Sequence, residues 1–359
     1  MSNSKPTVLV TGAAGNLGTR LLQQLEDFNI VAVDLAVPDS ASVVRFVRLD
    51  LGTESACGEL VLLLKETRAS AVVHLAFVID PVRTGVLDVG RQWQINVAGT
   101  ARVMEAITEC NRSGGSVRTF IFPSSVTSYG SDLERPATEE TRLAGHTLPY
   151  AIHKREADEV VQFRAASLGN CRAYILRPHI FMGASVENYI VGMLRGTPSG
   201  RGPRAERMRQ QGKKLPLVLP RGESYLQKEF QFVHVDDVAR LIAKILRTPP
   251  AEGTTILNVA GRGAPVTIGR CVEIAGQKLV RLPGKAACRA ALKLMWNLGI
   301  SGVPPEALDY MTGSFVMNTS RLRAFLGSDY ESVIRFTVEE ALKDTFRNHT
   351  AVQLTAASK

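Results

Sequence analysis

The sequence has no uninterrupted apolar run of the roughly 18–20 residues that a membrane-spanning helix needs. Residues 1–6 are short and polar, without the apolar stretch of a signal peptide. We therefore expect neither a membrane span nor a secretory leader.

Cysteine is scarce, and the spacing of the cysteines does not indicate a disulfide framework. The five residues are odd in number and widely scattered, at Cys57, Cys110, Cys171, Cys271 and Cys288. They show neither the spacing of metal ligands nor that of a disulfide-rich domain. We expect free thiols, no metal site and a cytoplasmic protein.

Nothing in the composition resembles a disordered or fibrous chain. Hydrophobic residues make up 45% of the 359 residues and charged residues 21%. A chain of this kind can bury a substantial core, so disordered, collagen-like and coiled-coil architectures are excluded. The length fits one large α/β domain or two interleaved lobes.

The excess of positive charge is concentrated in one stretch. Six of the nine net positive charges fall within residues 195–214, which glycine and proline interrupt. No aromatic residues alternate with these cations, so we expect no nucleic-acid partner. A solvated loop is the favoured interpretation, while a polyanion site and a lid for an anionic substrate stay open.

The first half of the chain alternates β-rich runs with amphipathic stretches. Apolar stripes at 17–28 and 157–168 predict two helices. The near-continuously apolar strand candidates are typical of a parallel sheet, whose strands need crossover helices. The predicted fold class is α/β, a doubly wound parallel sheet of Rossmann type. The strand candidates are residues 7–10, 30–33, 43–49, 71–75, 118–122 and 173–177.

After Arg177 the pattern changes. Residues 180–227 are rich in loop-forming residues, and two helices are expected at 238–246 and 285–298. We expect a smaller C-terminal substrate lobe formed by 180–227 and 261–359. Residues 1–179 would form the nucleotide-binding domain, with 228–260 returning to it through strands at 230–235 and 256–260.

The strongest early motif follows the first predicted strand. Gly12, Gly15 and Gly18 would allow a tight turn, a close approach to a pyrophosphate and close packing of helix on strand. Asn16 and Leu17 open the helix, whose free amides favour phosphate. This arrangement predicts a dinucleotide site.

Acidic residues end the next two strands. Asp34 would accept hydrogen bonds from the adenosine ribose, and no arginine follows it to hold a 2′-phosphate, so NAD is favoured over NADP. Asp50 and Leu51 could contact the adenine edge, and the Leu75–Ala76–Phe77 segment could line the path to the nicotinamide.

A candidate acid/base pair lies at Tyr150 and Lys154. Four residues apart on a helix, the two side chains share a face. The ammonium would lower the pKa of the phenol and let it exchange a proton with a substrate hydroxyl or carbonyl.

Together these motifs resemble the extended short-chain dehydrogenase/reductase superfamily and its NAD-dependent epimerase/dehydratase group. The similarity covers residues 7–260 and includes Asn96, the Ser124–Gly130 segment, Arg177–Pro178 and Phe232–Ala239. It implies that Ser125 is the catalytic hydroxyl, that Lys154 holds the nicotinamide ribose and that Asn96 lies beside the cofactor. It also implies a small-molecule substrate and a homodimer.

Departures from the family pattern narrow the chemistry. Val126 and Thr127 stand where dehydratases carry an Asp–Glu pair, so dehydration is not expected. Ile180 and Phe230 replace polar groups that bind a sugar diphosphate in epimerases. The main hypothesis is an NAD-dependent oxidoreductase or epimerase acting on a secondary hydroxyl or ketone, including that of a nucleotide sugar. Net oxidation or reduction of an apolar alcohol or ketone, and a non-catalytic dinucleotide sensor, remain alternatives.

Overall fold

The computed structural model describes residues 5–249 and 253–347, and its centre is a seven-stranded sheet in the order β11-β6-β5-β4-β1-β2-β3. Every pairing in this sheet is parallel, which confirms the predicted doubly wound α/β class. Each strand overlaps its predicted range, with ends that differ by at most two residues. The strands are β1 (Thr7–Thr11), β2 (Asn29–Asp34), β3 (Val43–Arg48), β4 (Ala71–His74), β5 (Thr119–Pro123), β6 (Arg172–Pro178) and β11 (Thr254–Val259).

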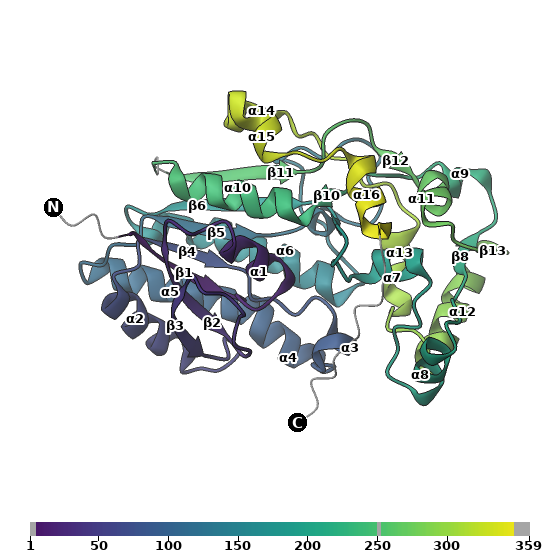
Figure 1. Cartoon of the computed structure of the whole chain (residues 1–359), viewed down its shortest axis with the longest axis horizontal. Coiled ribbons are helices and arrows are strands. Elements are labelled where there is room, and N and C mark those ends of the chain that lie inside the picture. Colours follow the sequence, from purple (N-terminus) through teal and green to yellow (C-terminus); the bar gives the residue numbers. More distant parts are fainter. Residues whose placement is uncertain (1–4, 250–252, 348–359) are drawn as a thin grey trace.

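Helices cover both faces of the sheet (Figure 1). The alternation of side chains along a strand divides the core in two. Val8 and Val10 of β1 pack into the cluster that holds α1 and α10, whereas Leu9 packs into the cluster that holds the other three helices. The covering helices are α1 (Asn16–Leu22), α10 (Val235–Arg247), α2 (Ala56–Thr67), α5 (Gly99–Arg112) and α6 (Pro149–Arg164).

A group of shorter elements lies at one end of the molecule (Figure 1). The segment 180–227, expected to be mostly loop, instead contains three helices and two strands. Asn188 caps the first of these helices, because its side chain accepts a hydrogen bond from the amide of Val191. The group comprises β7 (Phe181–Met182), α7 (Tyr189–Arg195), α8 (Pro203–Gln210), β8 (Leu217–Pro220), α9 (Glu223–Leu226), α11 (Ile268–Ala275), β13 (Leu279–Leu282), α12 (Gly284–Asn297) and α13 (Leu308–Met311).

The structure departs from the sequence prediction in two further elements. The first helix ends at Leu22, although Leu25 and Phe28 are buried as its apolar stripe predicted; both lie in turns that lead into β2. The strand expected at 230–235 is broken into β9 (Glu229–Phe230) and β10 (Val233–His234). The first pairs antiparallel with β12 (Val266–Thr267) and the second parallel with β7, so the chain changes partner between them.

Three helices lie in the last described part of the chain: α14 (Ser320–Leu326), α15 (Tyr330–Val333) and α16 (Val338–Phe346). Asp237, in the first turn of α10, anchors the segment before α16 by accepting hydrogen bonds from the amides of Arg335 and Phe336 at 3.2 and 3.1 Å. The side chain that caps α10 is that of His234 rather than an aspartate. Within the described ranges, no helix is long and apolar enough to cross a membrane.

A buried ion pair joins β6 to α6. Arg177 is 1% exposed and Asp158 0%, and the guanidinium donates to both carboxylate oxygens at 2.8 and 2.9 Å. It also donates to the hydroxyl of Tyr129 and the carbonyl of Glu139, both at 2.9 Å. The positive charge is therefore fully compensated although it is buried.

We expect Arg177→Met to destabilise the fold by roughly 3–5 kcal/mol, because it leaves the Asp158 carboxylate buried without its partner. Arg45→Met, which removes an exposed pair with Glu66, should cost less than about 1 kcal/mol. Urea unfolding followed by circular dichroism measures both. Equal losses in the two variants would show that the buried pair is not structurally important.

The sheet reverses its strand order at β1, which has β2 on one side and β4 on the other. Ligands of open parallel sheets bind at such a position, beyond the carboxyl ends of the strands. A buried chain of hydrogen bonds holds the ends of β1 and β4 together there: His74 contacts the hydroxyls of Thr11 and Thr100 at 2.7 and 3.0 Å. Burial lowers the pKa of His74 to about 3, so this imidazole is neutral and structural.

Candidate active site

The glycine loop lies between β1 and α1, at the point where the strand order reverses. Gly12 has φ +70°, and a Cβ there would lie 2.5 Å from the amide nitrogen of Ala76. Gly18 packs against the carbonyls of Gly12 and Ala13. Only glycine fits these two positions, which brings the loop backbone close to both the helix and the neighbouring strand end.

The loop leaves polar groups free for a ligand. The N-cap of α1 is Gly15, which has no side chain, so no capping side chain occupies the first-turn amides. The amide oxygen of Asn16 is buried without a partner among the described residues, while its nitrogen donates to the carbonyl of Ser185 at 3.0 Å. Leu17 points into the core. The uncapped first-turn amides are donors that fit the phosphates of a dinucleotide, whereas the Asn16 oxygen can only accept a hydrogen bond.

Asp34 lies at the end of β2 and faces the same loop. Its carboxylate accepts hydrogen bonds from the amides of Ala14 at 2.9 Å and Leu35 at 2.6 Å. Two carboxylate oxygens offer about four acceptor sites, so capacity remains for a ribose hydroxyl. Since the group is partly exposed, its position also fits the adenosine half of NAD.

The residues expected near the adenine are engaged with protein groups. Asp50 forms an ion pair with Arg91 and accepts a hydrogen bond from the amide of Gly52 at 2.8 Å. The side chain of Leu51 is 3% exposed and belongs to the core. Any contact of these two residues with a cofactor would therefore have to involve their backbone or a rearranged Asp50.

The strand end after β4 is fixed to the glycine loop and to α6. Leu75 donates its amide to the carbonyl of Thr11 at 3.0 Å, and Ala76 donates to the hydroxyl of Thr11 at 3.3 Å. Asn96 is fully buried and binds both backbone groups of Val78, at 2.6 and 3.0 Å. Asn96 thus sets the path of the segment that follows β4.

The side chain of Ser125 lies near the phenol of Tyr150, close enough to influence its pKa. Ser125 follows β5 and caps a 3₁₀ turn, and its hydroxyl also accepts from the amide and hydroxyl of Thr127 at 3.2 and 3.0 Å. Tyr150 lies in the first turn of α6, which Pro149 opens. Burial raises the pKa of Tyr150 to about 12, and the neighbouring Ser125 acts in the opposite direction. The expected lowering of this pKa by Lys154 is therefore wrong for the free protein, because burial of the phenol outweighs it.

Lys154 lies one helical turn after Tyr150 and is 5% exposed. Its amine donates to the carbonyl of Pro123 at 2.7 Å and lies 3.7 Å from the centroid of the Phe77 ring. Burial lowers its pKa to about 7, while the carboxylate of Asp158 favours the charged form. The lysine can therefore gain or lose a proton near neutral pH.

Phe77 contacts both Tyr150 and Lys154. Its edge meets the Tyr150 ring at a centroid distance of 6.0 Å, while its face receives the Lys154 amine. The sequence indicated the segment that contains Phe77 but not this double contact. The available indication in the sequence was that a bulky aromatic residue follows Leu75 and Ala76 at the end of a strand.

Tyr189, the first residue of α7, was missed. Its hydroxyl lies 3.5 Å from the carbonyl of Ile79, and its pKa is raised by burial and by the nearby Asp80 and Tyr150. The Asn188 cap before an apolar run could have revealed the helix. Nothing in the sequence indicated that this helix begins beside Tyr150.

Comparisons with known proteins find similar sequences. A UDP-glucose 4-epimerase of Oryza sativa subsp. japonica is 27% identical over 300 residues, which are 73% of this chain and 79% of the relative. A UDP-glucose 4-epimerase of Erwinia amylovora is 30% identical over 182 residues, covering 48% and 52% of the two chains.

Solved structures show the same fold. The Thermotoga maritima UDP-glucose 4-epimerase with UDP-glucose superposes with a TM-score of 0.64 at 20% identity, covering 94% of this chain and 97% of that one. The Thermus thermophilus UDP-glucose 4-epimerase with NAD gives 0.63 at 21% identity, with 96% and 99% covered. The sequence model of the NAD-dependent epimerase/dehydratase family matches residues 8–260. Since that match spans well over half of the chain, the protein belongs to this family and is an NAD-dependent enzyme.

Proposed function

We propose that this enzyme moves a hydride between NAD and the carbinol or carbonyl carbon of a substrate, with Tyr150 as acid/base. The observation that carries the proposal is the convergence of Ser125 and Lys154 on Tyr150: Ser125 lies near the phenol, and Lys154, one turn further along α6, shares the Phe77 ring with it. All three groups lie where β5 and α6 meet the carboxyl ends of the strands, next to the glycine loop.

The side chains of Ser125, Tyr150 and Lys154 would carry out the proton transfer. A substrate oxygen between Ser125 and Tyr150 would receive a hydrogen bond from the serine and exchange its proton with the phenol. Because the pKa of Tyr150 is raised to about 12 in the free protein, the phenol is the proton donor at rest. A positive charge on Lys154 favours the phenolate, which is needed to remove a proton from a hydroxyl.

The residues that would hold NAD follow from the geometry above. The backbone of Gly12, Gly15, Asn16, Leu17 and Gly18 would bind the pyrophosphate, and Asp34 the adenosine ribose. When bound, NAD supplies the carbon that accepts or returns the hydride. The adenine would lie near Asp50 and Leu51, and the nicotinamide side near Leu75, Ala76, Asn96, Tyr150 and Lys154.

Epimerisation is the reaction that the relatives favour, since several are UDP-glucose 4-epimerases. In that reaction the hydride returns to the same substrate, so the protein should keep its cofactor through purification and turn over without added NAD. Incubation with UDP-glucose, followed by chromatography of the nucleotide sugars, tests this. Stoichiometric build-up of reduced-nicotinamide absorbance with a secondary alcohol would instead assign net dehydrogenation, and ligand-dependent partner binding without turnover would assign a sensor.

Assembly and location also belong to the proposal. We propose a homodimer built on α5 and α6, because Phe163 on α6 is 86% exposed. Light scattering during size-exclusion chromatography should give twice the mass of 39.0 kDa, and Phe163→Glu should lower it. A monomer mass for the unmodified protein would contradict the dimer. A reducing cytoplasm suits the five cysteines, which are all free.

Phe77→Leu should shift the pH profile of the reaction. The face of an aromatic ring stabilises a desolvated ammonium by about 1–2 kcal/mol, so the leucine variant should lower the pKa of Lys154 by about one unit. The falling limb of kcat against pH, where Lys154 loses its proton, should move to lower pH. Phe77→Tyr keeps the ring face and is the control. An unchanged profile in the leucine variant would contradict this role of the ring.

A further inference from the structure

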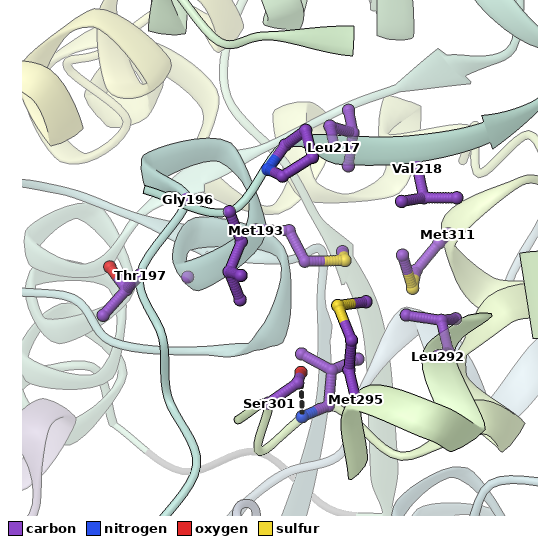
Figure 2. Close-up of a pocket in the computed structure, with 13 residues that line it drawn as sticks. Met193, Gly196, Thr197, Leu217, Val218, Leu292, Met295, Ser301 and Met311 are labelled. Carbon is purple, nitrogen blue, oxygen red and sulfur yellow. Dashed lines mark hydrogen bonds between the residues drawn. The ribbon is translucent and has the colours of Figure 1, made fainter. Parts of the chain in front are cut away.

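An apolar cavity lies between α7, β8 and α12, in the group of short elements beyond the sheet (Figure 1). Its free volume is about 30 Å³. Met193 of α7, Met295 of α12 and Met311 of α13 come from separate parts of the chain and gather around this space (Figure 2). Leu217, Val218 and Leu292 complete most of the remaining wall.

The cavity offers few polar contacts and no charge. Thr197 and Ser301 supply its only side-chain hydroxyls, and that of Ser301 already accepts a hydrogen bond from the amide of Val303 at 3.1 Å. Lysine and arginine are absent from the described residues that form its wall. An anion placed here would therefore lose its hydration without gaining a partner.

The nearest arginines of the basic stretch are directed elsewhere. Arg195 donates to the carbonyls of Val186 and Thr345 at 3.1 and 3.0 Å. Arg209 donates to the carbonyls of Pro198 and Gly200 at 2.5 and 2.9 Å. These cations stabilise the local backbone, so they do not prepare the cavity for phosphate.

The cavity is connected to the candidate active site through α7. Tyr189 and Met193 are four residues apart in this helix and hence lie on the same face, about one turn from each other. Tyr189 begins the helix against the carbonyl of Ile79, in the segment that follows Phe77. The helix therefore leads from the side of Tyr150, which lies near Tyr189, to the methionine that lines the cavity.

We propose that this cavity, bounded by Met193, Met295 and Met311, is a subsite for an uncharged apolar part of the substrate, such as an alkyl or aryl group. The inference rests on the proposed function, because it places the reacting carbon at Tyr150. A cavity of this volume holds about two water-sized groups, so longer groups enter as the methionines move. Methionine suits this task, since its side chain is unbranched and flexible.

Binding can be followed without turnover by NMR of protein labelled at the methionine methyl carbons. We expect 2-alkanones to shift the signals of Met193, Met295 and Met311, assigned through single Met→Leu variants, and affinity to rise about fourfold for each added methylene. Met104, buried in the sheet core, and Met208 on α8 supply control signals. UDP should leave all five signals in place.

A matched pair of variants separates this inference from the proposed function. Met193→Phe should weaken alkanone binding at least tenfold, whereas Met208→Leu should leave it unchanged. Shifts caused by UDP but not by alkanones would overturn the apolar subsite, and so would the absence of any shift with either probe. Alkanone binding in a protein that transfers no hydride would refute only the proposed function.

Discussion

Tyr150→Phe should lower kcat by at least about 10³-fold, because it removes the only proton that the phenol can exchange with the substrate oxygen. The aromatic ring and its edge contact with Phe77 remain, so the fold and NAD affinity should not change. Turnover and calorimetric titration with NAD measure the two effects. The separation of catalysis from binding is the expected signature of an acid/base residue.

Ser125→Ala provides the graded comparison. The alanine variant loses one hydrogen bond to the reacting oxygen but keeps the phenol, so a fall of about 10²-fold is expected. Thr127→Val removes only a hydroxyl that donates to Ser125 at 3.0 Å, and its effect should be smaller still. Turnover by Tyr150→Phe within tenfold of the unmodified enzyme would rule out the tyrosine as acid/base.

Gly12→Ala should abolish measurable NAD binding and destabilise the protein by about 1–3 kcal/mol. The residue has φ +70°, and the added methyl would meet the backbone of Ala76 at 2.5 Å and Leu75 at 2.6 Å. Backbone atoms cannot rotate away as a side chain can, so the loop must shift out of the position that binds phosphate.

Gly58→Ala is the matched control, since Gly58 lies within α2 and a Cβ there meets nothing within 4 Å. It should leave NAD binding unchanged and stabilise the helix by roughly 0.5–1 kcal/mol. Calorimetry with NAD and thermal unfolding report both quantities. NAD affinity in the Gly12 variant equal to that of the unmodified protein would contradict the proposed phosphate site.

Regular features of the fold were predictable because they depend on local patterns. The strands β1, β4, β5 and β6 are buried on both faces of the sheet, and such strands can be recognised in a sequence as continuous apolar runs. The four-residue spacing of Tyr150 and Lys154 likewise needs only a helix. The convergence of Ser125 on Tyr150 was implied by resemblance to the family, and in the structure the two side chains lie near each other.

Features that depend on long-range packing were not predictable. The strand expected at 230–235 breaks because Phe230 pairs with Val266 while Val233 pairs with Phe181. Nothing local to Lys154 indicates that an aromatic face and the Pro123 carbonyl surround its amine. In the same way, the ion pair of Asp50 depends on Arg91, which lies 41 residues further along the chain in the helix Val89–Trp93.

The central claim is that NAD binds across the glycine loop with its reactive end beside Tyr150. A crystal structure of the NAD complex tests it most directly. The account predicts a pyrophosphate on the amides that follow Gly15, a ribose hydroxyl on Asp34, and a nicotinamide ring that leaves room for a substrate carbon about 3–3.5 Å away, next to the phenol oxygen. A dinucleotide bound elsewhere, or a nicotinamide ring remote from Tyr150 and Lys154, would contradict it.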